Sequence, residues 1–254
     1  MPASDPRYFQ ATEITTATYD QKAGDYAERN AEPGKFWVER MGRFIELMEE
    51  AREERPIPDL TGLGRPGDDI ALDEYLAFVP VLDAGCGHGR DARTLAAHGL
   101  PVLAVDLSQG MLDAAGERTP RRLPQGAIRY ALMDLRRLDL PDASVRGVWC
   151  SASLLHLPMR TAPRAMAELA RVARAGAPVA LFLKLRKPDE EPERYELYPG
   201  EPPDGLRRFY AYYSEDEARA LIASAGLELV ELLVRGKVVS PADHAWICAL
   251  ARKA

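Results

Sequence analysis

Short apolar runs alternate with helical patterns between residues 79 and 184. Glycine, proline or polar residues bound each run, which is typical of buried strands. The segments between the runs repeat apolar residues every three or four positions, as amphipathic helices do. Strands that alternate with helices predict a parallel sheet with helices on both faces. The predicted strands are 79–83, 101–106, 128–133, 145–151 and 178–184.

The C-terminal part of the chain breaks this alternation. Residues 214–217 (SEDE) have the sequence of a capping box, and the helix that it opens should stop at Gly226. Two apolar runs follow, 227–234 and 245–250, with only residues 235–244 between them. That connection is too short for a helical crossover, so the runs predict an antiparallel pair. We therefore expect a Rossmann-like, doubly wound α/β sheet of seven strands, mostly parallel, with an ending that is unusual for a dehydrogenase.

Three further segments flank or interrupt this sheet, and we predict that the whole forms a single domain, 1–254. Residues 7–54 have a helical pattern in which Tyr19 and Tyr26 share one face, and we predict a helical cap over the carboxyl edge of the sheet. Residues 55–69 and 187–205 are rich in proline and acidic residues and predict surface loops. We interpret 187–213, which ends in the aromatic string FYAYY, as an insert that caps a substrate pocket; the alternative is an edge strand that packs on the core.

Composition and charge narrow the classes of function. The net charge of −6 disfavours nucleic acid, and DNA above all, as the main partner. No apolar run is long enough to span a bilayer and no secretory signal opens the chain, so we predict a cytoplasmic protein without a membrane partner. Three widely spaced cysteines suggest free thiols, and we predict no metal site. The sequence leaves the oligomeric state open.

The strongest chemical signal is VLDAGCGHG at residues 81–89, where an apolar strand runs into three alternating glycines. Such glycines let the backbone turn tightly and approach a ligand at the carboxyl end of a strand. A dinucleotide site needs a small third residue in the pattern G-x-G-x-x-G/A, but Arg90 stands there. Asp83, just before the glycines, also disfavours a phosphate ligand. A dehydrogenase is therefore the weaker interpretation.

The same string resembles motif I of the class I methyltransferases that depend on S-adenosylmethionine (SAM), and of their small-molecule group in particular. Acidic residues at the ends of the next two strands, Asp106 and Asp134, extend the resemblance in order and spacing. SAM has a free ribose diol and an adenine amine but no phosphate, so carboxylates can accept hydrogen bonds from it. The resemblance implies SAM as cofactor and S-adenosylhomocysteine as product.

The resemblance also implies which positions contact the cofactor. In the family, the first acid binds the ribose hydroxyls, the second lies by the adenine, and the end of the fourth strand lies by the methionine part. The N-terminal tyrosines correspond to aromatic residues that close over the cofactor in similar proteins. The predicted cofactor residues are Tyr19, Tyr26, Asp83, Gly85, Cys86, Gly87, Gly89, Asp106, Leu107, Met111, Asp134, Leu135 and Ser151.

His156, just past the fourth strand, is a candidate general base near the expected methyl channel, although a structural role is as plausible. His88, inside the glycine loop, is expected to face solvent. The sequence lacks an Asn/Asp-Pro-Pro-Tyr motif after the fourth strand, which disfavours methylation of a base amino group. We expect a small-molecule acceptor. An RNA methyltransferase and a non-catalytic SAM-binding protein remain as alternatives.

Overall fold

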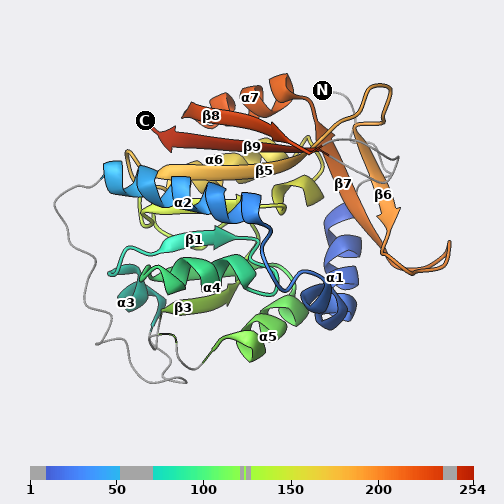
Figure 1. Ribbon diagram of the computed structural model, residues 1–254, viewed down its shortest axis with the longest axis horizontal. Coiled ribbons are helices and arrows are strands. Elements are labelled where there is room, and N and C mark those ends of the chain that lie inside the picture. The colour runs from blue at the N-terminus through green and yellow to red at the C-terminus, as the bar shows by residue number, and fades with distance from the viewer. Residues whose placement is uncertain (1–9, 52–70, 121–122, 124–126, 237–244) are drawn as a thin grey trace.

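The core of the protein is a sheet with helices packed on both faces (Figure 1). The computed structural model describes residues 10–51, 71–120, 123, 127–236 and 245–254. Five parallel strands run in the order β3-β2-β1-β4-β5, and β9 and β8 extend the sheet from β5 with antiparallel pairing. The predicted Rossmann-like sheet is thus confirmed. Its strands are β1 (Val81–Ala84), β2 (Val102–Asp106), β3 (Ile128–Leu132), β4 (Gly147–Ser151), β5 (Pro178–Leu185), β8 (Leu227–Arg235) and β9 (Trp246–Lys253).

Two hydrophobic clusters bury the faces of the sheet because successive strand residues point to opposite sides. On β4, Val148 packs in the cluster that contains α6, whereas its neighbour Trp149 packs in the cluster that contains α2. The ring of Trp149 lies 5.3 Å from that of Phe44 between centroids. The helices are α2 (Lys35–Glu50), α3 (Leu72–Leu76), α4 (Arg90–Ala97), α5 (Gln109–Arg118), α6 (Ala162–Val172) and α7 (Glu215–Ser224).

The N-terminal segment does not form one continuous cap. Helix α1 (Ala11–Arg29) packs against α5 and β7 beside the carboxyl ends of the strands, as predicted. Helix α2 instead covers a face of the sheet, because its apolar stripe through Met41, Phe44 and Leu47 is buried there. Within 7–54, α1 thus lies at the carboxyl edge of the sheet and α2 on one of its faces, and the bounds of the cap stay a prediction. Its residues 7–9 and 52–54, like the predicted loop 55–69, lie outside the described residues.

The insert after β5 forms a β-hairpin and not the surface loop that its composition predicted. Strands β6 (Glu193–Leu197) and β7 (Arg207–Tyr213) pair antiparallel, and Tyr212 and Tyr213 of β7 continue the sheet beside the end of β5. The sheet therefore has nine described strands, and the expectation of seven is wrong by this hairpin. Side chains of α1 hold β7, since Thr15 Oγ1 accepts from the Phe209 amide at 2.9 Å and Thr18 Oγ1 donates to the Arg207 carbonyl at 2.7 Å.

Local capping signals largely have the predicted effect. The capping box at Ser214 and Glu217 is complete, and Ser108 Oγ accepts from the Met111 amide at 3.1 Å. Thr161 precedes α6, but its hydroxyl donates to the Pro158 carbonyl and caps no helical amide. Among the described helices, none is both long enough and apolar enough to cross a membrane.

Candidate functional site

The glycine loop between β1 and α4 needs its glycines for different reasons. All three have positive φ, +76° at Gly85, +52° at Gly87 and +75° at Gly89. A Cβ on Gly85 would collide with the Ser153 side chain, and one on Gly89 would lie 2.6 Å from the Tyr130 hydroxyl oxygen. A Cβ on Gly87 would meet nothing within 4 Å, so this glycine opens space and the other two allow close packing.

Asp83 brings to this loop a carboxylate of which one oxygen has no partner among the described residues. Its side chain is 1% exposed, and its Oδ2 has no hydrogen-bond partner among the described residues. Burial raises the pKa of Asp83 well above its usual value, and the nearby Asp91 carboxylate adds to the rise. A buried acceptor without a partner is costly, so the position favours a ligand that donates a hydrogen bond or carries positive charge.

Asp106, at the end of β2, is held by two backbone amides. Gly87 N–H donates to Oδ2 at 2.8 Å and Ser108 N–H donates to Oδ1 at 2.9 Å. Burial raises the pKa of Asp106, and these hydrogen bonds oppose the rise. Each carboxylate oxygen can accept more than one hydrogen bond, so both can still receive a hydroxyl pair from a ligand.

Asp134, after β3, is already engaged by a side chain. Arg136 donates to Oδ2 from Nη2 at 2.6 Å and to Oδ1 from Nε at 3.0 Å, and its amide donates to Oδ1 at 2.8 Å. Burial alone would raise the pKa of Asp134, but the hydrogen bonds from Arg136 bring it below the usual value. A ligand amine would have to share this carboxylate with the guanidinium.

These groups meet in one pocket, which we call the loop pocket. Thirteen of the fourteen predicted site residues line it, and Gly89 does not because it packs beneath the loop against Tyr130. Their contact with a cofactor stays a prediction.

The sequence interpretation missed the roles of Arg90 and Asp91, although both follow the glycine motif directly. Arg90 Nε donates to Asp91 Oδ1 at 2.8 Å, and Trp149 Nε1 donates to Asp91 Oδ2 at 2.9 Å. The full lining is Thr12, Thr15, Thr16, Tyr19, Tyr26, Asp83, Gly85, Cys86, Gly87, His88, Arg90, Asp91, Asp106, Leu107, Met111, Met133, Asp134, Leu135, Ser151, Ala152, Ser153, His156 and Leu157.

Tyr19 and Tyr26 of α1 close one side of the loop pocket. Their rings meet edge to face with centroids 5.4 Å apart, which confirms that they share a helix face. The ring of His88 lies 5.7 Å from Tyr26, and its Nε2 is 3.1 Å from the Asn30 carbonyl oxygen. His88 is only 3% exposed, so the expectation that it faces solvent is wrong. The loop histidine instead ties the glycine loop to the end of α1.

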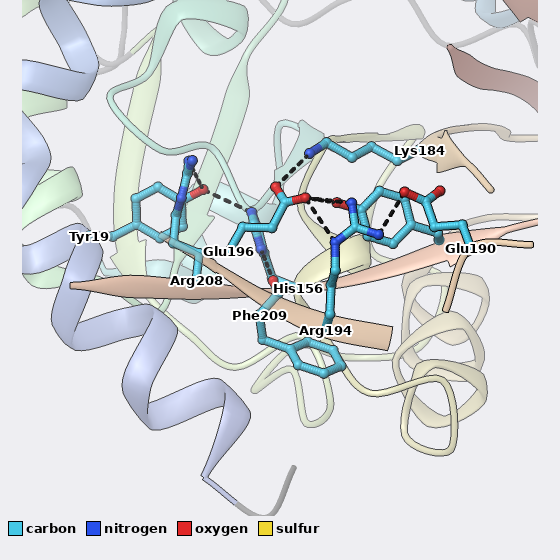
Figure 2. Close-up of polar contacts among 9 residues, drawn as sticks. Tyr19, His156, Lys184, Glu190, Arg194, Glu196, Arg208 and Phe209 are labelled. Atoms are coloured by element: carbon cyan, nitrogen blue, oxygen red, sulfur yellow. Dashed lines mark hydrogen bonds and ion pairs between the residues drawn. The ribbon is translucent and has the colours of Figure 1, made fainter. Parts of the chain in front are cut away.

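His156 lies beside Tyr19, in the 3₁₀ turn η3 (Leu154–His156). Its Nδ1 is 2.7 Å from the Phe209 carbonyl oxygen, and a carbonyl can only accept, so Nδ1 carries the proton. Nε2 then accepts from the Tyr19 hydroxyl at 2.8 Å, and Arg208 Nη1 donates to that hydroxyl at 3.3 Å (Figure 2). Burial lowers the pKa of His156 to about 3. The imidazole is therefore neutral and already has a hydrogen-bond donor.

A second pocket adjoins the first, and we call it the hairpin pocket. It shares Tyr19, Tyr26, Ala152 and His156 with the loop pocket. Its charged lining residues are all cationic: Arg29, Lys184 and Arg208. Burial lowers the pKa of Lys184 to about 8, so this lysine remains largely protonated at neutral pH. The remaining lining residues are Asn30, Leu155, Tyr198, Pro199, Tyr210 and Trp246.

Comparisons with known proteins agree on the family. Residues 81–176 match the family model described as "Methyltransferase domain". This match and the strand order of the sheet agree with each other. Residues 81–176 form a class I methyltransferase domain. A malonyl-[acyl-carrier protein] O-methyltransferase of Serratia marcescens is 42% identical over 105 residues, which are 41% of this chain and 38% of that protein. A 27-O-demethylrifamycin SV methyltransferase of Amycolatopsis mediterranei is 32% identical over 154 residues, 58% of this chain and 53% of that protein.

A solved structure extends the likeness of the methyltransferase domain to the whole chain, as a fold. The 1,6-didemethyltoxoflavin-N1-methyltransferase of Burkholderia thailandensis, with its acceptor and S-adenosylhomocysteine bound, has a TM-score of 0.59. It is 19% identical, and the match covers 100% of this chain and 92% of that one. The curated relatives above match over only about two-fifths to a half of their own length. At 19% identity the likeness to the solved structure is one of fold.

Proposed function

We propose that this protein transfers a methyl group from SAM to an oxygen atom of a small organic acceptor. The loop pocket would hold SAM and the hairpin pocket would hold the acceptor. The observation that carries the proposal is that the two pockets meet, since Tyr19, Tyr26, Ala152 and His156 line both. A methyl transferase needs two adjoining sites so that the reacting atoms lie close and in line. The named activities of the two O-methyltransferase relatives support oxygen as the acceptor atom.

The chain's own residues fit the cofactor. Asp106 has acceptor capacity left for the ribose diol, and the unpartnered Oδ2 of Asp83 can receive a donor from the amino-acid end. The open space at Gly87 lets a ligand approach the backbone. When bound, SAM supplies an electrophilic methyl group on a sulfonium. The other predicted contacts, such as Leu135 and Met111, would pack against the adenosine part.

The reaction would depend mainly on positioning. With a pKa of about 3, His156 is a weak proton acceptor, which argues against a free-standing general base. We propose instead that His156 and Arg208 fix the Tyr19 hydroxyl at the junction of the two pockets. Tyr19 would then orient the acceptor oxygen toward the methyl group. An acceptor that already carries an anionic oxygen needs no strong base.

Calorimetric titration with S-adenosylhomocysteine tests the cofactor site first. Asp106→Asn should weaken binding by about 10- to 100-fold, because hydrogen bonds to a charged carboxylate contribute roughly 1.5–3 kcal/mol. The control is Asp113→Asn, an exposed carboxylate on α5 that accepts only from Gln109 among the described hydrogen bonds. No binding by the wild type would overturn the assignment.

Methyl transfer itself needs a separate measurement, because binding alone also fits a non-catalytic SAM-binding protein. The assay incubates the full chain with methyl-labelled SAM and either small phenols and carboxylic acids or bulk RNA. Label in the small molecules supports the proposal. Label in RNA would favour the RNA alternative, and binding without transfer to any acceptor would favour the non-catalytic one.

A further inference from the structure

A chain of paired charges begins at Lys184, which lines the hairpin pocket, and continues through Glu196 and Arg194 to Glu190 (Figure 2). Lys184 Nζ lies 3.4 Å from Glu196 Oε2, and Arg194 Nη2 lies 2.7 Å from Glu196 Oε1. Arg194 Nη1 also contacts Glu190 Oε1 at 2.6 Å. Lys184 and Arg194 thus each have a carboxylate partner, which is the usual condition for cations that are partly removed from water.

Arg208, on the neighbouring strand β7, lacks such a partner. Among the described residues no carboxylate lies within ion-pair distance of its guanidinium, and its buried Nε has no hydrogen-bond acceptor. Its one described hydrogen bond is the 3.3 Å contact from Nη1 to the Tyr19 hydroxyl. Three tyrosine rings lie around it, with centroids 4.9 Å (Tyr198), 5.2 Å (Tyr210) and 5.6 Å (Tyr19) from Cζ.

The aromatic rings offset only part of the cost of this arrangement. A cation over a ring face is attracted to it, but a ring offers no acceptor for the N–H groups of a guanidinium. The edge formed by Nε and Nη2 is the one that binds a carboxylate through two parallel hydrogen bonds. Nη1 already contacts the Tyr19 hydroxyl, whereas the buried Nε has no hydrogen-bond acceptor among the described residues. Arg208 also lines the hairpin pocket, so a bound molecule can reach it.

The other residues that line the hairpin pocket indicate the charge and shape of its ligand. Its lining contains the two other cations, Arg29 and Lys184, and no aspartate or glutamate. Five of its thirteen lining residues are tyrosine or tryptophan, and Lys184 Nζ lies 3.7 Å from the centroid of the Tyr210 ring. A positive, aromatic pocket suits a planar ring that carries negative charge.

We propose that Arg208 binds a carboxylate of the acceptor, so that the acceptor is a small aromatic carboxylic acid. This inference rests on the proposed function only in calling the bound acid the methyl acceptor. The site itself is an anion site formed by α1 and the hairpin. Tyr19 joins it to the loop pocket, because the same hydroxyl contacts both Arg208 and His156.

The test compares each acid with its uncharged amide. Benzoate, 4-hydroxybenzoate and cinnamate, and the three corresponding amides, are titrated into the full-length protein with and without saturating S-adenosylhomocysteine. The wild type should bind at least one acid at least about tenfold more tightly than its amide, as expected for a charge-assisted, bidentate pair. Arg208→Gln should abolish this preference, and Arg208→Lys should restore part of it because it keeps the charge and loses the fork.

The matched control is Arg207→Gln. Arg207 precedes Arg208 on the same strand, so its side chain points to the opposite side, where it donates to the Pro203 carbonyl. This variant should keep the preference for the acid. Melting temperatures of all variants are measured so that a folding defect is recognised, and Arg208→Lys provides a second reading if Arg208→Gln is unstable.

Three outcomes would overturn the inference: no acid binds, acids and amides bind equally, or Arg208→Gln keeps the preference. Failure of the proposed function looks different. In that case the wild type does not bind S-adenosylhomocysteine, or no acceptor is methylated, while the preference for acids and its dependence on Arg208 persist.

Discussion

The two adjoining pockets differ in charge, in composition and in the part of the chain that forms them. The loop pocket is acidic, with Asp83, Asp91, Asp106 and Asp134 against Arg90. The hairpin pocket has three cations and an aromatic lining. A cationic sulfonium fits the first and an aromatic anion fits the second. Two neighbouring pockets of opposite charge, which share a few lining residues, can each attract the reactant of complementary charge.

The largest expected effect concerns the backbone that shapes the loop pocket. Gly85→Ala should abolish binding of S-adenosylhomocysteine and destabilise the fold by about 2–4 kcal/mol, because it adds a collision with Ser153 to the strain of a positive φ. Gly87→Ala should cost only about 1 kcal/mol, since its Cβ meets nothing within 4 Å. Denaturant unfolding and calorimetry measure both. Equal stability of the two variants would contradict the separate roles assigned to these glycines.

A crossed pair of variants tests whether the pockets are independent. Asp106→Asn should lower affinity for S-adenosylhomocysteine about 10- to 100-fold and leave the preference for aromatic acids unchanged. Arg208→Gln should abolish the preference for aromatic acids and keep the affinity for S-adenosylhomocysteine within about twofold of wild type. The reason is that Arg208 lines the hairpin pocket and not the loop pocket. The measurement is titration of both variants with both ligands. If either variant impaired both sites equally, the two-pocket description would be wrong.

Substitutions of Tyr19 and His156, which line both pockets, should change the rate of methyl transfer more than the affinity for either ligand. His156→Ala and Tyr19→Phe should each lower kcat by about tenfold with little change in cofactor affinity, and the double variant should be little worse than either one, since they act as a unit. His156→Gln should keep most of the activity and the same pH profile, because an amide can also accept from Tyr19. Loss of the acidic limb of the pH profile in His156→Gln would instead identify His156 as the general base.

The smallest effect is a pH dependence of stability. Burial lowers the pKa of His156 to about 3 and that of His88 to about 4, whereas an unfolded histidine titrates near 6.5. Below about pH 6.5 the unfolded state therefore binds more protons, so the stabilisation present above that pH is lost as the pH falls toward 4–3. Each histidine should cost roughly 1–2 kcal/mol at pH 5.

Comparison with a variant isolates this effect from the buried aspartates. The pKa of Asp83 is raised, so its contribution changes in the opposite direction with pH. Melting temperatures of wild type and His156→Gln are measured from pH 7 to pH 5. The wild type should lose more stability than the variant, and parallel curves would show that His156 is not buried as a neutral group.

The parallel sheet, its antiparallel ending and most residues that line the loop pocket could be predicted from local patterns in the sequence. The alternation of apolar runs, the closing antiparallel pair and the acids at or next to the carboxyl ends of β1, β2 and β3 are local patterns. Parallel strands bring their carboxyl ends to one edge of the sheet, so these acids meet there. Helix caps such as Ser108 and Ser214 are local patterns too.

The hairpin pocket, in contrast, could not be predicted from the sequence. Its residues come from α1, the segment between β4 and the end of η3, β5, the hairpin and the start of β9, and no sequence spacing relates Tyr19 to Arg208 or Lys184. The composition of 187–205 predicted a loop, because strand pairing between β6 and β7 depends on a partner distant in sequence and not on local preference. The placement of α2 on the sheet face was also beyond the pattern, since an apolar stripe shows that a helix is buried but not what buries it.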